Sequence, residues 1–230
     1  YATTTGNTTL IFDGTPPGGF DANENIDAIH VLPNGHMILS VDGDAMLSGL
    51  SIIDGDLVEY DPVSDTATIF LAEGAIFSGN EDIDAVFIRS DGPGCNAMTG
   101  VGCQIVISTE TTATLSGGIT FSDGDLVEFD PNNPSAGTVL LDEGLFTGGV
   151  DVDAVHIIAN GHILLSTVAD ATLGEAVEPP DTPFSFSKGD IIEYDPVTGI
   201  SIEVLDEETA FETAANVLSL IHISDPTRPS

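Results

Sequence analysis

Short apolar runs separated by turn residues recur along the chain and predict β-strands. Two such runs, Ile26–Leu32 and Met37–Val41, flank an Asn-Gly pair. This pair is typical of a two-residue hairpin turn, in which both central residues take positive φ. A second hairpin is predicted where Leu57–Tyr60 and Thr66–Leu71 flank an Asp-Pro turn. Residues 42–56 are expected to form a longer connection rich in Gly, Asp and Ser.

The same order of strands and turns returns twice, which identifies a tandem repeat. The predicted strands are Ile83–Ile88, Gln104–Ser108, Leu126–Phe129 and Gly137–Leu141 in the second copy, and Val152–Ile158, His162–Thr167, Ile191–Tyr194 and Ile200–Leu205 in the third. The first strand of the repeat is apolar on both faces, as expected of a strand packed between neighbouring sheets. The best helical candidate, Asp206–Val217, is short.

Four short strands in roughly 60 residues, repeated in tandem, are the pattern of a β-propeller blade. We therefore predict an all-β fold of tandem four-stranded antiparallel blades, with about three blades and partial blades at both ends. The predicted domain covers 1–217, with a partial blade and link at 1–25, blades at 26–82 and 83–151, and a blade with the start of the next at 152–217. Because propellers have four to eight blades, we expect a fragment of a longer protein.

The end of the chain departs from the repeat. Residues 211–217 match the link at 20–26 position for position, so a fourth copy is expected to follow. Instead, residues 218–230 are unlike anything upstream and include His222 and Arg228. This segment resembles translated sequencing-adapter DNA of the kind found at the ends of environmental reads. We interpret it as a non-native tail, with a natural divergent C-terminus as the alternative.

The phrase at 26–40, followed by Asp-Leu-Val-Glu-Tyr-Asp-Pro at 56–62, resembles the blades of NHL-type and lactonase-like propellers. Such blades run from an apolar strand through an Asn-Gly or Asp-Gly turn into a second apolar strand. A third strand then ends in an Asp-Pro or Asp-Gly turn. The resemblance covers about residues 1–217 and implies the fold rather than a reaction, since one fold hosts many functions.

The net charge of the chain restricts its possible partners. Thirty-eight acidic residues face three basic ones, which gives a formal net charge of −35. Nucleic acid and anionic membrane surfaces are therefore poor partners, since both need clustered Lys and Arg. The apolar runs are also too short for membrane insertion. An acidic surface repels itself unless cations screen it. This leaves two interpretations open, a halophile-type solvated surface and specific sites for divalent cations.

Oxygen-bearing side chains alternate along the entry to each first strand. They are Asp21, Asn23, Asn25 and Asp27 in the first copy, Asn80, Asp82 and Asp84 in the second, and Asp151 and Asp153 in the third. Ca²⁺ takes six to eight oxygen ligands, and alternating Asp and Asn in a loop supply them. We hypothesise weak Ca²⁺ sites with Asp27, Asp84 and Asp153 as inner ligands. The alternative is that these side chains accept hydrogen bonds from backbone N–H groups at the turn.

The Asp-Gly-Asp loops at 42–44, 54–56 and 123–125 are further candidates for chelation. In the third copy Lys188 replaces the first Asp, which argues against a shared obligatory ligand. Gly permits the positive φ of a tight turn. A role in the turn is therefore the favoured interpretation.

Histidines recur in the first hairpin of copies one and three. With Asn-Gly as a two-residue turn, His30 is expected to pair with Leu39, and His30 and His36 to lie on opposite faces of the sheet. The same is expected of His156 and His162. Because the second copy has Phe87 in place of the first histidine, a packing role is favoured over a metal site.

Two cysteines, Cys95 and Cys103, lie in an insertion that only the second copy contains. They are expected to close a small disulfide loop at a hairpin tip. A disulfide suits an oxidising, extracytoplasmic compartment. The sequence has no Cys-x-x-Cys or mixed Cys/His spacing typical of zinc sites.

No catalytic motif of a serine hydrolase, a phosphate-binding loop or a zinc protease occurs in the sequence. The favoured interpretation is a secreted or cell-surface acidic β-propeller fragment that acts as a cation-stabilised binding or structural module. Its expected partners are divalent cations together with a protein, a glycan or further copies of itself. The alternatives are a Ca²⁺-dependent hydrolase of lactonase type and a self-assembling extracellular repeat protein.

Overall fold

A computed structural model describes Phe12, Phe20 and residues 25–90, 94–96, 98–176 and 182–210. The described residues are predominantly β-structure, arranged in several small antiparallel sheets. Most of the expected partial blade at 1–25 and the whole tail at 218–230 lie outside the described residues. The fold is therefore described for the three repeats that the sequence predicts.

Each repeat contains four strands that pair antiparallel in chain order, and in the third repeat two further strands join the same sheet. In the first sheet the strands are β1 (Ile26–Val31), β2 (Met37–Val41), β5 (Leu57–Asp61) and β6 (Thr66–Leu71). In the second they are β7 (Ala85–Arg89), β8 (Gln104–Ser108), β11 (Leu126–Asp130) and β12 (Asn133–Leu141). In the third they are β13 (Val152–Ile157), β14 (Ile163–Thr167), β17 (Ile191–Asp195) and β18 (Ile200–Leu205). The strands predicted from the sequence are thus present in the predicted order.

The connection between the second and third strands of each repeat contains a further pair of strands, which the sequence did not predict. These pairs are β3 (Ala45–Leu47) with β4 (Leu50–Ile52), β9 (Ala113–Thr114) with β10 (Thr120–Phe121), and β15 (Ala171–Ala176) with β16 (Pro183–Phe186). The pairs form because they bury apolar side chains of an otherwise polar loop. Leu47 and Ile52, for example, are 0% and 1% exposed. The third pair joins its sheet through a parallel contact between β15 and β18.

A short helical turn follows the fourth strand of each repeat. These turns are α1 (Glu73–Ile76), the 3-10 turn η1 (Glu143–Leu145) and α2 (Glu207–Ala210). The segment Asp206–Val217, named above as the best helical candidate, contains α2, and residues 211–217 lie outside the described residues. The sequence did not predict the other two turns, because four residues are too few for a helical hydrophobic pattern.

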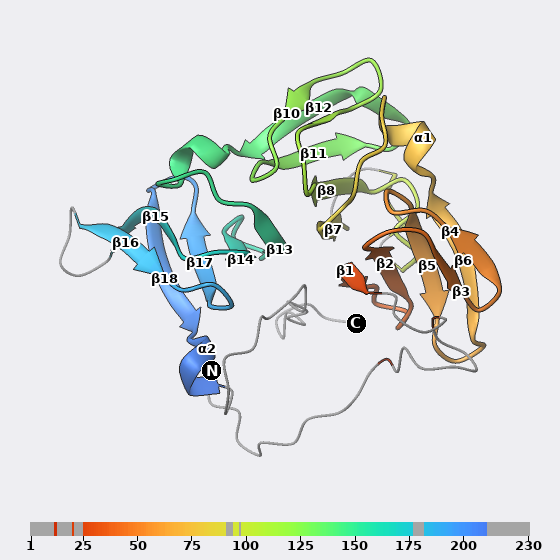
Figure 1. The fold of residues 1–230 in the computed structure, drawn as a ribbon, viewed down its shortest axis with the longest axis horizontal. Helices are drawn as coiled ribbons and strands as arrows, with labels where there is room; N and C mark the ends of the chain where they lie inside the picture. Colours follow the sequence, from red (N-terminus) through yellow and green to blue (C-terminus); the bar gives the residue numbers. More distant parts are fainter. Residues whose placement is uncertain are drawn as a thin grey trace.

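The three sheets stand side by side in an open arc, with their first strands nearest the centre (Figure 1). β1 contacts β7, and β7 contacts β13. Apolar clusters fill the space between successive sheets. Ile38 and Ile105 belong to the cluster between the first and second sheets, whereas Val106 and Leu165 belong to the cluster between the second and third. Neighbouring residues of β8 thus point into different cores, and so do Val86 and Phe87 of β7, the first strand of the second repeat. This explains why the first strand of the repeat is apolar on both faces.

The predicted register of the first hairpin is wrong by one residue. His30 pairs with Ile38 rather than with Leu39. The loop has three residues, because Leu32 donates its N–H to the carbonyl of His36 and Gly35 donates to the carbonyl of Leu32. Gly35 takes a positive φ of 89°, which closes a three-residue hairpin loop in place of a two-residue turn. His30 and His36 consequently lie on the same face of the sheet, and His156 and His162 follow the same register.

Candidate metal centre

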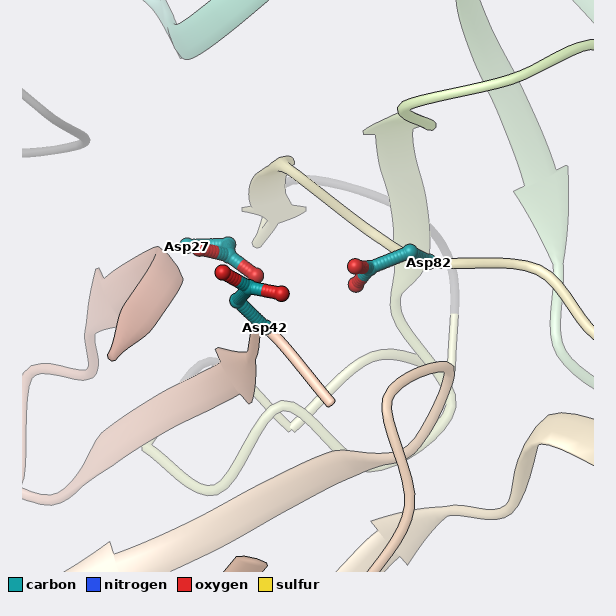
Figure 2. Close-up of side chains that lie close together, drawn as sticks. All are labelled: Asp27, Asp42 and Asp82. Atoms are coloured by element: carbon teal, nitrogen blue, oxygen red, sulfur yellow. The ribbon is translucent and has the colours of Figure 1, made fainter. Parts of the chain in front are cut away.

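Three carboxylates from two consecutive repeats converge at the junction between the first and second sheets (Figure 2). Asp27 lies in β1, Asp42 follows β2, and Asp82 lies in the link that leads to β7. One carboxylate oxygen from each residue lies within 4.8 Å of the others. The arrangement joins the repeats in space, whereas the sequence pattern placed the ligands of each site within one loop.

A β-bulge directs Asp27 into this cluster. The ladder between β1 and β2 pairs Ile26 with Val41 and Ala28 with Ser40, so Asp27 is the extra residue. A bulge re-aims the side chain that it carries. The N–H of Asp42 donates to the carbonyl of Asn25 at 3.1 Å, which holds the two strand ends together beside the bulge. The third repeat has the same irregularity at Asp153, between the pairs Val152–Thr167 and Ala154–Ser166.

The cluster is electrostatically unfavourable without a counter-charge. Burial, together with the charges of Asp42 and Glu110, raises the pKa of Asp27 to about 7. Burial and the repulsion from four other carboxylates together raise the pKa of Asp82 to about 7; these are Asp27, Asp54, Glu110 and Asp42. Five acidic side chains therefore share this junction, and a bound cation or protons must offset their repulsion.

The remaining predicted ligands of the first two copies occupy supporting positions. Asn25 donates its side-chain amide to Asp27 Oδ1 at 3.4 Å. Asn80 donates to Asp54 Oδ2 at 3.2 Å, on the side of the junction where Asp54 faces Asp82. Asp21 and Asn23, also predicted as ligands, lie outside the described residues.

A second pair of carboxylates, Asp84 and Asp151, meets at the junction between the second and third sheets. Both carboxylate oxygens of Asp84 and Oδ1 of Asp151 are buried and have no hydrogen-bond donor. Burial, the charge of Asp151 and a hydrogen bond with the Asp151 carboxyl together raise the pKa of Asp84 well above its ordinary value. Burial also raises the pKa of Asp151 to about 7. Asp153, predicted as the third inner ligand, instead accepts a 2.5 Å hydrogen bond from Ser166 Oγ through its Oδ1.

The Asp that directly follows Gly in this turn of each repeat has a structural role. Asp56, Asp125 and Asp190 are each 7% exposed. In each repeat one carboxylate oxygen accepts the N–H that begins the turn, and the other accepts the N–H of the glutamate that begins the following helical turn. These donors are Ile53 and Glu73, Ser122 and Glu143, and Ser187 and Glu207. The carboxylates are thus committed to backbone donors, as the turn interpretation of this motif expects.

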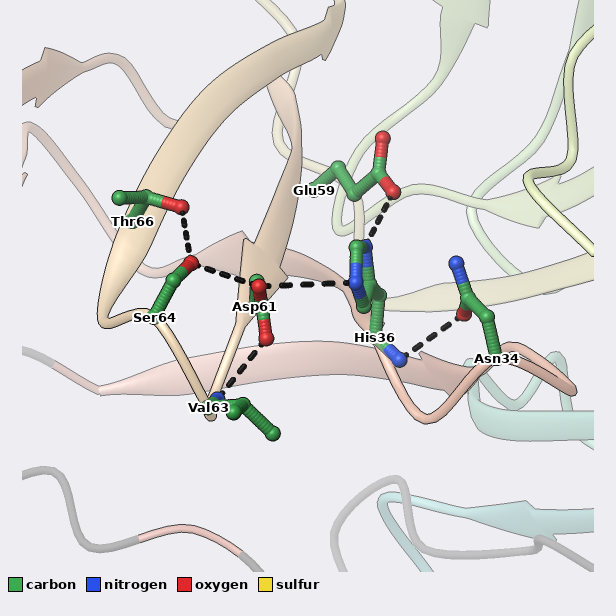
Figure 3. A network of polar contacts seen from close by, with 7 residues as sticks. All are labelled: Asn34, His36, Glu59, Asp61, Val63, Ser64 and Thr66. Carbon is green, nitrogen blue, oxygen red and sulfur yellow. Dashed lines mark hydrogen bonds and ion pairs between the residues drawn. The ribbon is translucent and has the colours of Figure 1, made fainter.

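The histidines at the hairpin ends belong to a polar network that the sequence analysis missed (Figure 3). His36 Nδ1 lies 2.6 Å from Glu59 Oε1, and its Nε2 lies 3.7 Å from Asp61 Oδ2. His162 repeats both contacts with Glu193 and Asp195, at 2.6 and 3.6 Å. In the second repeat Arg89 Nε lies 3.2 Å from Glu128 Oε1 instead. The recurring signal is a Glu on the third strand opposite a basic side chain of the first hairpin.

The other two histidines pack between the sheets. The rings of His30 and Phe87 meet edge to face with centroids 5.2 Å apart. Phe87 and His156 meet in the same way at 4.9 Å. One aromatic contact chain therefore connects the first strands of all three sheets, in agreement with the favoured packing role.

Cys95 and Cys103 are joined by a disulfide. The bridge closes the insertion between β7 and β8. Cys103 is 0% exposed and belongs to the core between the first and second sheets, against which Cys95 is partly buried. The disulfide thus fastens the insertion to that core.

Comparison with protein-family models and with the sequences of curated proteins finds no match to this chain. Among the described residues, no helix has the length and apolar character needed to cross a membrane.

Proposed function

We propose that this chain is part of a secreted or cell-surface β-propeller-type protein, acting as a binding or structural module whose successive sheets are held together by Ca²⁺. The observation that carries the proposal is the convergence of Asp27, Asp42 and Asp82 from consecutive repeats, with ligand oxygens within 4.8 Å of one another. Ca²⁺ binds its oxygen ligands at 2.3–2.6 Å, so oxygens on opposite sides of one ion lie up to about 5 Å apart. The spacing of the three carboxylates fits that geometry.

The donor set favours a hard cation. All three groups are carboxylates, which suit Ca²⁺ and Mg²⁺, whereas zinc sites typically include Cys or His. Asp42 is exposed and Asp27 and Asp82 are half-buried, so water can complete the coordination. Ca²⁺ accepts six to eight ligands in flexible geometry, whereas Mg²⁺ demands a near-ideal octahedron. A site assembled from two sheets and completed by water therefore suits Ca²⁺ better.

The extracellular, propeller-type part of the proposal has separate support. The three sheets share one strand order, and their first strands contact one another near the centre of the arc. This arrangement agrees with adjacent propeller blades. The Cys95–Cys103 disulfide is typical of an oxidising compartment. There Ca²⁺ is abundant, and extracellular modules bind it with Kd on the order of 10⁻⁴–10⁻³ M.

Calcium is expected to raise the Tm of the protein, and Asp42→Asn is expected to reduce that rise. A ligand that binds only the folded state stabilises it by RT ln(1 + [L]/Kd), which is about 1.4–2.7 kcal/mol for 10 mM Ca²⁺ at this affinity. Thermal unfolding with Ca²⁺ or EDTA measures the effect. Asp44→Asn is the matched control, since Asp44 is also exposed and lies outside the cluster. Equal calcium responses in the two variants would contradict the proposed site.

The pH dependence provides an independent test. With EDTA present, we expect the free energy of unfolding to fall between about pH 4 and pH 7. Unfolded Asp titrates near pH 4, whereas Asp27 and Asp82 keep their protons to about pH 7 in the folded state. The folded state therefore binds more protons in this window, and stability decreases as they are lost. Urea unfolding of the wild type and of Asp27→Asn should show a shallower decrease in the variant; identical slopes would refute this assignment.

A further inference from the structure

We propose that the junction between the second and third sheets holds a second divalent cation, bound between the carboxylates of Asp84 and Asp151. This inference extends the proposed calcium-stabilised module and rests on it for the choice of Ca²⁺. The site differs from the first because both of its carboxylates are partly buried, whereas the first site includes the exposed Asp42.

The repeat relates the two junctions residue by residue. Asp84 occupies in the second copy the position of Asp27 in the first, directly before the Ala that starts the shared Ala-Ile/Val phrase. Asp151 occupies in the third copy the position of Asp82 in the second. The pair Asp84–Asp151 therefore corresponds to the pair Asp27–Asp82 one repeat later. Asp123, which corresponds to Asp54, acts electrostatically on Asp151 as Asp54 does on Asp82.

The third ligand distinguishes the two sites. Glu110 stands in the second copy where Asp42 stands in the first, and its N–H donates to the carbonyl of Asp82 as that of Asp42 donates to the carbonyl of Asn25. Glu110 contributes charge to the first junction, where it acts on Asp27 and Asp82. The second junction thus has no counterpart of the exposed Asp42 among the residues that act on Asp84 and Asp151.

The unsatisfied oxygens point to a bound ion. Both oxygens of Asp84, Oδ1 of Asp151 and Oδ2 of Asp153 are buried without a hydrogen-bond partner, and Asp153 is only 2% exposed. A buried acceptor without a partner is costly. One proton shared between Asp84 and Asp151 forms a single hydrogen bond and leaves the second oxygen of Asp84 unsatisfied. A divalent cation neutralises two carboxylates and accepts several oxygens at once.

The test is the number of Ca²⁺ ions bound by the full chain, measured by equilibrium dialysis after treatment with EDTA. The wild type is expected to bind two ions, and Asp84→Asn and Asp151→Asn one each. Asp44→Asn is the control and is expected to retain both. Since each substitution at the pair removes a buried charge, both variants are expected to fold without metal, with a Tm in EDTA at or above that of the wild type.

Unchanged binding of Ca²⁺ by Asp84→Asn and Asp151→Asn would overturn the second site and assign the pair to proton sharing. Asp42→Asn separates this result from failure of the first site. If the wild type binds one ion that is lost in Asp84→Asn but kept in Asp42→Asn, the second site stands and the first is wrong. If the single ion is lost only in Asp42→Asn, the inference fails and the proposed function stands.

Discussion

Replacing Phe87 with Ala is expected to lower the free energy of unfolding by about 3–5 kcal/mol. Phe87 is 7% exposed and its ring contacts those of His30 and His156, so it connects the first strands of all three sheets. Truncation removes the buried ring surface and leaves a cavity where the sheets meet. Urea unfolding followed by circular dichroism measures the loss.

Two companion variants make the Phe87 prediction specific. Phe87→His introduces the residue that the other repeats carry at this position, and its loss is expected to be smaller because an aromatic ring remains. Val63→Ala is the control, since Val63 is 93% exposed, and surface substitutions usually change stability by less than about 0.5 kcal/mol. A loss below about 1 kcal/mol for Phe87→Ala would show that the sheets do not pack through this ring.

Replacing Asp125 with Ala is expected to cost about 3–5 kcal/mol, because two hydrogen bonds to a charged acceptor are lost together. Asp125 accepts the N–H of Glu143 at 2.7 Å and that of Ser122 at 2.9 Å. Both donors lie where the turn before β11 meets the 3-10 turn η1. The side chain thus links the two ends of the hairpin β11–β12, and its removal leaves two N–H groups without a partner.

Asp125→Asn is expected to cost about half as much as Asp125→Ala, because an amide keeps one of the two acceptor oxygens. Asp142→Ala is the matched control for charge. Asp142 is exposed and caps η1 through a single hydrogen bond to the N–H of Gly144, so about 1 kcal/mol is expected. The same denaturant titration ranks the three variants. Equal losses for Asp125→Ala and Asp142→Ala would contradict the bridging role.

The repeat and most strand positions could be predicted because the information is local. An apolar run with turn residues at both ends specifies a strand wherever it occurs, and β2, β6, β8 and β18 have the predicted bounds. The role of Asp56, Asp125 and Asp190 in their turns could also be predicted, because Asp and Gly have defined conformational preferences in turns. Five of the six extra strands were missed because they have only two to four residues; the exception is β15. Such short strands show little alternation.

The sequence pattern did not determine the register of the first hairpin or the direction of the Asp27 side chain. Asn-Gly fits both a two-residue turn and the end of a three-residue loop, and the structure has the longer loop, which pairs His30 with Ile38. A single bulged residue then sets the direction of Asp27. Neither feature changes the composition of the strands, so the hydrophobic pattern is the same in both cases.

The sequence alone determined that acidic side chains recur at the entry of each repeat and that the repeats form separate small sheets. It did not determine which carboxylates come together. In the folded protein Asp27 lies close to Asp82, and Asp84 lies close to Asp151, each pair across a junction between different repeats. Those meetings depend on how successive sheets pack against each other. The packing depends on apolar side chains distant in sequence from the carboxylates, so the spacing of Asp and Asn along one loop does not encode it.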